Sequence, residues 1–265
     1  MENIFTLAES CLHQTEAGSK IATTHKAIKM LERGELSFKS TEPIKPISLT
    51  RFPNQPQLLS PRDMPKRSVN SPLGKVAFFH ALAHIEFVAI YLAWDILYRF
   101  RGLPNKFYQD WLRVADEEAQ HFTLIRSYLL EMGADYGELP AHSGLWEHAE
   151  ETSIDVLDRL ALVPRCMEAR GLDVTPQMIE KFNRQGDNKS VVLLTKILED
   201  EIEHVKLGSY WFKTICQQRG INHEEKYVEL IEKFYVGKPK GPFNRELRII
   251  AGFSNAEIDW LEQSV

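Results

Sequence analysis

The sequence predicts an all-α protein built on an antiparallel four-helix bundle, with extensions before and after it. Four long segments carry apolar residues at alternating steps of three and four, the spacing of the buried seam of a bundle helix. Stretches with the alternation of a β-strand are scarce. The chain has 265 residues, near the upper limit for one hydrophobic core, so one main domain is expected. We expect N-terminal helices and a proline-rich arm over 1–72, the bundle over 73–219 and a C-terminal helical extension over 220–265.

The region before the bundle combines helix-compatible segments with the arm. A helix is expected over Lys20–Arg33, ending at Gly34. The arm, Pro43–Pro72, contains seven prolines. Because each proline fixes φ and lacks a backbone donor, the arm is expected to run extended over the surface. A basic run in and after the arm is interpreted as surface linker rather than as an RNA contact: Arg62, Lys66, Arg67 and Lys75.

The bundle helices are expected at 73–101, 105–132, 149–170 and 188–219. Gly102-Leu-Pro104 separates the first two, and a longer crossover, Gly133–Ser143, leads to the third. Pro164 is expected to kink or interrupt the third helix just before Glu168.

Shorter helices are expected around the fourth bundle helix. One lies before it, bracketed by Gly171–Pro176 and Gly186-Asp187. After Gly220 we expect a helix over His223–Tyr235 and two short helical pieces that end near Gln263.

Composition indicates a soluble globular protein. Hydrophobic residues make up 43% and charged residues 26% of the chain, and a net charge of −5 does not favour broad nucleic-acid or membrane-surface binding. The most apolar stretch, 76–94, is interrupted by His80, His84 and Glu86, which favours a buried core helix over a membrane span. The three cysteines form neither a disulfide framework nor a metal knuckle, and no signal peptide is recognised, so a cytoplasmic location is expected.

Acidic residues and histidines replace apolar residues in the middle of each bundle seam. The four seams carry, in order, Glu86, the pair Glu118 and His121, Glu168, and the pair Glu201 and His204. Burying an isolated carboxylate is costly unless it is paired, hydrogen-bonded or bound to a metal. A Glu and a His three residues apart lie on one helix face, about 4.5 Å apart along the axis, so the pair can grip one metal ion.

The spacing between the helices strengthens this reading. Each Glu-x-x-His motif follows a lone seam glutamate, by 32 residues from Glu86 to Glu118 and by 33 from Glu168 to Glu201. One such motif is weak evidence, but two with matching partners form the ligand set of two-metal carboxylate bundles. We therefore predict two metal ions held by these six residues, with iron favoured and manganese or zinc as alternatives.

Other residues near the predicted ligands have less specific expected roles. Asp200 and Glu117 precede ligands, and we expect Asp200 to contact His121 and Glu117 to contact His204, the alternative being solvated charges. His80 and His84 lie four residues apart and could chelate a metal, but they lie off the stripe of Glu86 and are interpreted as helix-surface or packed histidines. Four aromatic residues are interpreted mainly as core: Trp94, Trp111, Trp211 and Tyr128, the last on a seam and with a redox role as the alternative.

Five stretches carry a family resemblance: Ser60–Arg67, His80–Glu86, Asp116–Phe122, Met167–Asp173 and Glu199–Val205. They resemble a family of bacterial ferritin-like proteins of unassigned function. The resemblance implies the ferritin-like fold and places the six metal ligands at the positions named above. The arrangement is also similar, more distantly, to the di-iron hydroxylase that acts on isopentenylated adenosine in tRNA, which implies oxygen activation. Unlike rubrerythrins, the chain lacks a Cys-x-x-Cys iron domain, and Ala93 stands where storage ferritins commonly have a tyrosine, so a cage is not expected.

Three functions fit these features. The first is an O2-activating oxidoreductase, a hydroxylase or an oxidase, acting on a small molecule or a modified base. The second is a non-oxygenase iron-binding or ferroxidase-type protein. The third is a helical protein in which the metal is structural. The arm and the C-terminal tail are expected to cover the bundle or to form a homodimer contact.

Overall fold

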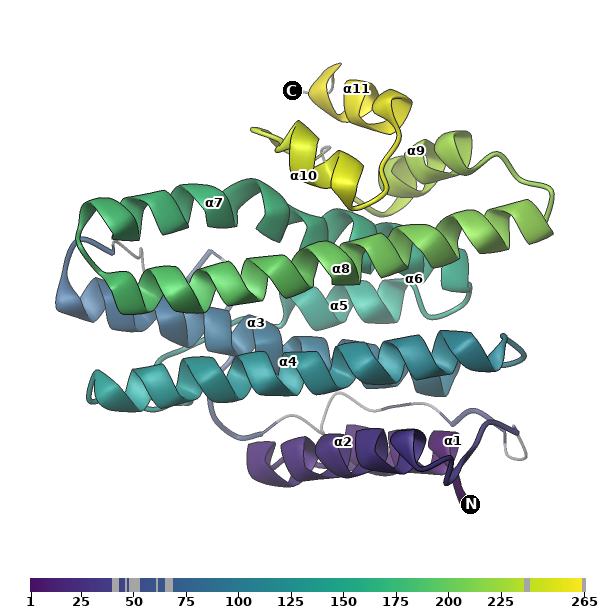
Figure 1. The fold of residues 1–265 in the computed structure, drawn as a ribbon, viewed down its shortest axis with the longest axis horizontal. Coiled ribbons are helices and arrows are strands. Elements are labelled where there is room, and N and C mark those ends of the chain that lie inside the picture. The colour runs from purple at the N-terminus through teal and green to yellow at the C-terminus, as the bar shows by residue number, and fades with distance from the viewer. Residues whose placement is uncertain are drawn as a thin grey trace. The chain divides into compact units, whose positions relative to one another are not determined.

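The computed structural model describes residues 1–265 except 40–42, 46, 48–52, 61, 65–68, 236–238 and 264–265. The chain forms two compact units, Met1–Glu147 and His148–Val265 (Figure 1). Both are helical, and the strands in the described part of the chain are a short parallel pair, β1 (Glu2–Asn3) and β2 (Leu36–Ser37). The prediction of an all-α fold is confirmed.

The first unit is built on a hairpin of two long helices, α3 (Pro72–Arg99) and α4 (Asn105–Glu131). Ser71 caps α3 by accepting a hydrogen bond from the Gly74 amide at 3.1 Å, and Pro72 occupies the first turn. The helices are joined through Gly102, whose φ of 74° suits a residue without a Cβ. A short link of this kind sets two neighbouring helices antiparallel.

Two shorter helices cover this hairpin. Helix α1 (Ile4–His13) packs on α3, and α2 (Ala17–Glu32) packs on α4 (Figure 1). This covering explains why α3 is apolar on nearly every face, since a helix that is hydrophobic all round needs neighbours on all sides. Helix α3 is the one described helix long and apolar enough to cross a membrane, but 67% of its most apolar window is buried inside the protein. Most of this window is packed inside the protein, as predicted for a buried core helix.

A buried lysine lies beneath this cover. Lys20 of α2 is fully buried, its ammonium group donates a hydrogen bond to the carbonyl of Cys11, and it lies 3.5 Å from the centre of the Tyr91 ring. Burial lowers the pKa of Lys20 from 10.5 to about 8, partly opposed by the charge of Cys11. The α1–α2 cover therefore contains a lysine that loses its proton at a lower pH than an exposed lysine does.

The proline-rich arm is only partly described. Its residues 57–59 exchange backbone hydrogen bonds with Ala141 in the crossover after α4. Of the basic residues assigned to the surface linker, Arg62 is exposed, while Lys66 and Arg67 lie outside the described residues.

The second unit is built on α8 (Asn188–Gln218) and the segments that pack along it. These segments follow one another without a gap: α6 (Val156–Leu162), the π-helix η2 (Val163–Glu168) and α7 (Ala169–Arg184). Short helix α5 (Gly144–Glu151) carries the boundary between the two units. The later helices, α9 (His223–Phe234), α10 (Arg245–Ile250) and α11 (Asn255–Gln263), pack against one another and against α6, α7 and α8.

The predicted third helix, 149–170, is wrong in both of its limits. The chain breaks at 152–155, where Asp155 caps α6 through the Leu157 amide, and the helix then runs on past Gly171 and Pro176 to Arg184. The break predicted at Gly171–Pro176 is therefore also wrong. A proline inside a helix removes one hydrogen bond and strains the preceding turn, and packing of α7 on α8 outweighs that cost.

The interruption predicted at Pro164 takes the form of the π-helix η2, in which Pro164 lies in the first turn. Opposite it, α8 carries Gly208, and a Cβ built on Gly208 would lie 2.6 Å from the Cβ of Pro164. Only glycine allows this approach, because real Cβ atoms are not found so close to another carbon. The pair fixes the place where η2 lies on α8.

The core of the second unit contains ion pairs as well as apolar side chains. Arg165 of η2 is fully buried, donates to Glu257 of α11 at 2.8 Å, and lies over the rings of Phe212, Tyr227 and Phe253. A second buried pair joins Arg248 of α10 to Asp173 of α7 at 2.7 Å. Elsewhere, Trp94, Trp111 and Trp211 are all buried, which confirms their assignment to the core.

Candidate metal centre

Three of the predicted metal ligands meet in the hairpin of the first unit. Helix α3 carries Glu86, and α4 carries Glu118 and His121 one turn apart. The Nδ1 atom of His121 lies 3.2 Å from an oxygen of Glu86 and 3.7 Å from an oxygen of Glu118. Each of the three offers a ligand atom within 4.8 Å of the others, and no side chain is more than 4% exposed. These residues could hold a metal ion.

The electrostatics of this cluster are those of a site that attracts cations. Burial lowers the pKa of His121, but hydrogen bonds and charges from Glu118 and Glu86 outweigh burial and raise the pKa to about 11. Without a metal, His121 therefore holds a proton between the two carboxylates. Two buried carboxylates beside one imidazole need a compensating positive charge, which either a proton or a metal ion can supply. A divalent metal is the cation that all three groups can ligate.

The second unit presents the same types of ligand. Glu201 and His204 lie one turn apart on α8, with 3.5 Å between an oxygen of Glu201 and Nδ1 of His204. His204 is buried, and the Glu201 side chain is 15% exposed. Glu168 is the last residue of η2, which packs on α8. The close packing of Pro164 on Gly208 thus positions the segment that carries Glu168.

The six predicted ligands therefore form two sets of three, one in each unit. The first set, Glu86, Glu118 and His121, is drawn together within ligand distance. In the second, Glu201 and His204 are neighbours on one helix, and Glu168 comes from an element in contact with that helix. The donor types, four carboxylates and two imidazoles without cysteine, fit iron, manganese or zinc.

The residues next to the ligands have partners of their own. Asp200 accepts a hydrogen bond from the Lys196 ammonium at 2.6 Å, within α8. Glu117 is half-buried on α4. The expected contacts of Asp200 with His121 and of Glu117 with His204 stay predictions.

The two histidines that precede Glu86 are packed rather than exposed. His80 is 1% exposed, and its Nε2 accepts hydrogen bonds from the amides of Gly137 and Leu139. His84 is 5% exposed and binds the Tyr136 hydroxyl and the His142 carbonyl. Both histidines therefore anchor the crossover after α4 to α3 by hydrogen bonds. The structure agrees with the interpretation of these residues as packed histidines.

Tyr136 is a functional candidate that the sequence did not single out. It lies in the crossover between two glycines, outside any helical seam, so no periodic pattern marks it. The available signal was indirect: two histidines four residues apart, away from the ligand stripe, need polar partners when buried. The structure identifies those partners in the crossover.

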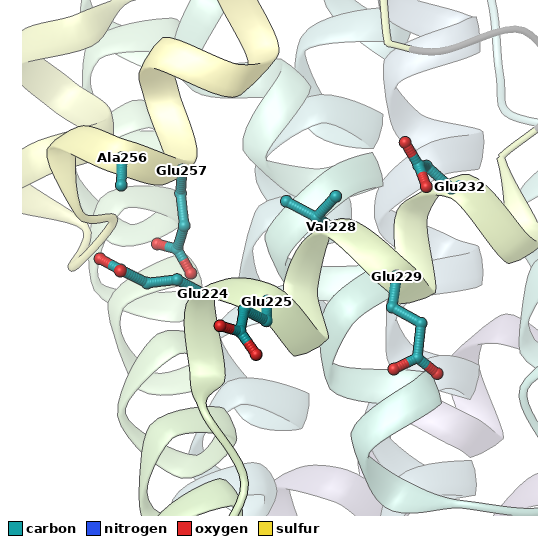
Figure 2. A pocket seen from close by; sticks show the side chains of 7 residues that line it. All are labelled: Glu224, Glu225, Val228, Glu229, Glu232, Ala256 and Glu257. Atoms are coloured by element: carbon teal, nitrogen blue, oxygen red, sulfur yellow. The ribbon is translucent and has the colours of Figure 1, made fainter.

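A hollow of about 450 Å³ lies between α9 and α11 in the second unit (Figure 2). No predicted metal ligand lines it; its lining consists of Val228, Ala256 and five glutamates, Glu224, Glu225, Glu229, Glu232 and Glu257. Glu257 is buried and bound to Arg165. The remaining acidic residues follow one face of α9, which is the arrangement of a solvated helix face.

Comparison with known proteins gives a family and a relative. Residues 13–259 match the model of a family described as "Protein of unknown function (DUF455)". The chain is 43% identical over 221 residues to an uncharacterized protein of Haemophilus influenzae, a match that covers 81% of this chain and 77% of that protein. No solved structure matches the chain.

Proposed function

The chain belongs to the DUF455 family of proteins of unknown function, and we propose from its own residues that it holds a two-metal carboxylate centre, most readily di-iron, and works as an O2-activating oxidoreductase. The reaction class is that of a hydroxylase or an oxidase. The observation that carries the proposal is the buried cluster of Glu86, Glu118 and His121.

Charge balance supports two metals rather than one. The proposed ligands are four glutamates and two histidines: Glu86, Glu118, His121, Glu168, Glu201 and His204. Two divalent ions carry four positive charges, which neutralise four carboxylates when both imidazoles are neutral. A buried centre that is neutral as a whole avoids the large cost of an uncompensated charge in a low dielectric.

The proposal requires the two sets of ligands to share one centre. In ferritin-like carboxylate bundles, each of two helix hairpins supplies one lone Glu and one Glu-x-x-His motif. This chain has the same allotment, with one set in each unit, and the resemblance of the stretches around the ligands supports the ferritin-like arrangement. A bound metal pair in such a site can activate O2 at open coordination positions.

A second candidate function is a structural or iron-binding centre without oxygenase chemistry. It is favoured by the closure of the first ligand set, whose side chains are at most 4% exposed. A closed site stabilises the fold that holds the metal, and it admits a substrate poorly.

Metal counting after anaerobic reconstitution with Fe²⁺ tests the proposal. We expect two iron ions per chain and a change in the absorption spectrum when O2 is added. Fewer than two metals per chain after full loading would refute the dinuclear centre. Two metals without a spectral change under O2 would support the structural candidate instead.

A matched pair of variants on α8 tests the ligand assignment. Glu201→Gln removes a proposed ligand charge with little change of shape. Glu203→Gln is the control, because Glu203 is on the same helix, 64% exposed and paired with Lys206. We expect Glu201→Gln to lower the metal content and Glu203→Gln to leave it unchanged. Equal metal content in both variants would contradict the role of Glu201.

A further inference from the structure

Tyr136 is hydrogen-bonded to a buried histidine in a geometry suited to proton transfer. Its hydroxyl oxygen lies 2.9 Å from Nδ1 of His84, and Nε2 of His84 lies 3.1 Å from the carbonyl oxygen of His142. A carbonyl only accepts, so Nε2 carries the hydrogen and Nδ1 of the neutral ring is left as an acceptor. The Tyr136 hydroxyl therefore donates to His84.

Tyr136 also contacts the rings of two residues that directly follow ligands of the first set in the sequence. Phe87 follows Glu86 on α3, and Phe122 follows His121 on α4. The ring centres of Phe87 and Phe122 lie 5.2 Å apart, and they lie 5.4 and 5.0 Å from that of Tyr136. Tyr136 thus packs on two side chains that directly follow proposed ligands in the sequence.

Tyr136 also lines a surface pocket. Tyr136 is half-buried and lines a cavity of about 400 Å³ together with Thr15, Glu16, Gln55 and Arg126, among others. Arg126 is held in place by two hydrogen bonds to Asp135, each of 2.7 Å. The ring therefore contacts both the buried rings of Phe87 and Phe122 and a cavity that a small solute can enter.

We propose that Tyr136 is a redox-active tyrosine that relays an electron from this surface pocket to the metal centre, with His84 as its proton acceptor. The inference rests on the proposed function for its oxidant, the oxidised metal pair. Tyr136 gives up one electron to that oxidant, its O–H bond breaks, and the proton forms a new N–H bond at Nδ1 of His84. A neutral phenoxyl radical and an imidazolium result. A small one-electron reductant in the pocket then supplies an electron to the radical, and the proton returns from His84 to the phenol oxygen.

The state of the phenol makes the acceptor necessary. Burial raises the pKa of Tyr136 above its ordinary value, helped by the charge of Tyr91, so the hydroxyl stays protonated at neutral pH. Removing only an electron would leave a buried cation, which is costly in a low dielectric. Transfer of the proton within the existing hydrogen bond avoids that charge on the ring.

Other buried tyrosines provide a contrast. The hydroxyls of Tyr91, Tyr108 and Tyr227 donate to backbone carbonyls, those of Gln14, Phe100 and Arg165. An amide carbonyl is a poor proton acceptor compared with an imidazole nitrogen. Tyr91 is thus a matched control, because it is buried in the same hairpin and its ring also contacts Phe87.

Flash photo-oxidation of the metal-free protein tests the inference. Ruthenium tris-bipyridine with persulfate serves as the one-electron oxidant, and electron paramagnetic resonance detects the neutral tyrosyl radical. We expect a radical in the wild type, loss of most of its signal in Tyr136→Phe, and an unchanged signal in Tyr91→Phe. An undiminished signal in Tyr136→Phe would overturn the proposal.

The proton acceptor has its own test. His84→Gln keeps a polar side chain but removes the base, and we expect the radical yield to fall by about tenfold or more. High-field spectra should also show a shifted g-value for the residual radical, because this value reports the hydrogen bond to the phenoxyl oxygen. A merely structural role for His84 would leave both unchanged in variants whose circular dichroism matches the wild type, and that result would overturn the proposal.

The oxidation assay separates this inference from the proposed function, because it contains no metal. A radical at Tyr136 together with a metal content below two per chain would refute the metal centre and the relay to it, and would leave Tyr136 and His84 as an oxidisable pair. Two metals per chain with no radical at Tyr136 would refute the relay alone. Ascorbate, a small one-electron reductant, should shorten the radical lifetime in the wild type, and a lifetime independent of ascorbate would contradict access through the pocket.

Discussion

The buried amine of Lys20 predicts an unusual dependence of stability on pH. Unfolding returns Lys20 to water, where its pKa is 10.5, from a folded state in which burial holds the pKa at about 8. Between these two values the unfolded chain binds a proton that the folded chain does not. The free energy of unfolding therefore rises as the pH rises through this interval.

The size of the effect follows from the two pKa values. Each pKa unit corresponds to about 1.4 kcal/mol, so a lowering from 10.5 to about 8 corresponds to about 3 kcal/mol. Below the pKa in the folded state, Lys20 is protonated in both states, and the folded state bears the full cost of burying the charge. Near the pKa in the unfolded state, this cost has largely disappeared.

Urea denaturation of the wild type and of Lys20→Met, compared from about pH 7 to about pH 10, measures this effect. The variant keeps Cys11 and Tyr91, so most other titrations cancel in the difference between the two proteins. We expect the wild type to gain about 3 kcal/mol relative to the variant across this range. A difference that stays constant with pH would refute the description of Lys20 as a buried amine with a lowered pKa.

Three further predictions concern the second unit and the metal. Gly208→Ala should destabilise the protein by about 1–3 kcal/mol in chemical denaturation, because the new Cβ meets Pro164. Gly171→Ala, where nothing lies within 4 Å of the new Cβ, should be neutral or stabilising, and equal losses would contradict the close-packing argument. Glu257→Gln should cost about 3–5 kcal/mol, because it leaves Arg165 buried without its counter-charge, whereas replacing both residues by apolar ones should recover much of that loss. Loading with Fe²⁺ should raise the melting temperature and chelation should lower it, and a melting temperature indifferent to metal would argue against any bound ion.

The long helices whose limits follow simple local rules could be predicted from the sequence. Helices α3, α4 and α8 begin and end within about two residues of the predicted limits, because apolar spacing, a capping residue and glycine or proline turns agree with one another there. The third segment could not be predicted. A π-helix has no apolar period of its own, and whether Pro176 ends a helix depends on packing that the local sequence does not contain.

Part of the candidate site could also be predicted from the sequence, and part could not. Glu86, Glu118 and His121 stand out in the sequence because each interrupts an apolar seam, and the structure brings them together. Tyr136 and its partner His84 are 52 positions apart, and neither interrupts a seam, so only the fold of the crossover reveals them. Polar residues on periodic elements are visible to sequence reasoning, and contacts made by loops are not.

The two buried ion pairs of the second unit have a consequence for the order of events during synthesis. Arg165 lies in the segment that ends with Glu168, yet its counter-charge, Glu257, is made 92 residues later. Arg248 and Asp173 are joined in the same way across 75 residues. A nascent chain that has emerged only as far as α8 thus has an unneutralised arginine where η2 should settle. The segment that carries Glu168 therefore gains the buried counter-charge of Arg165 only when α11 is in place.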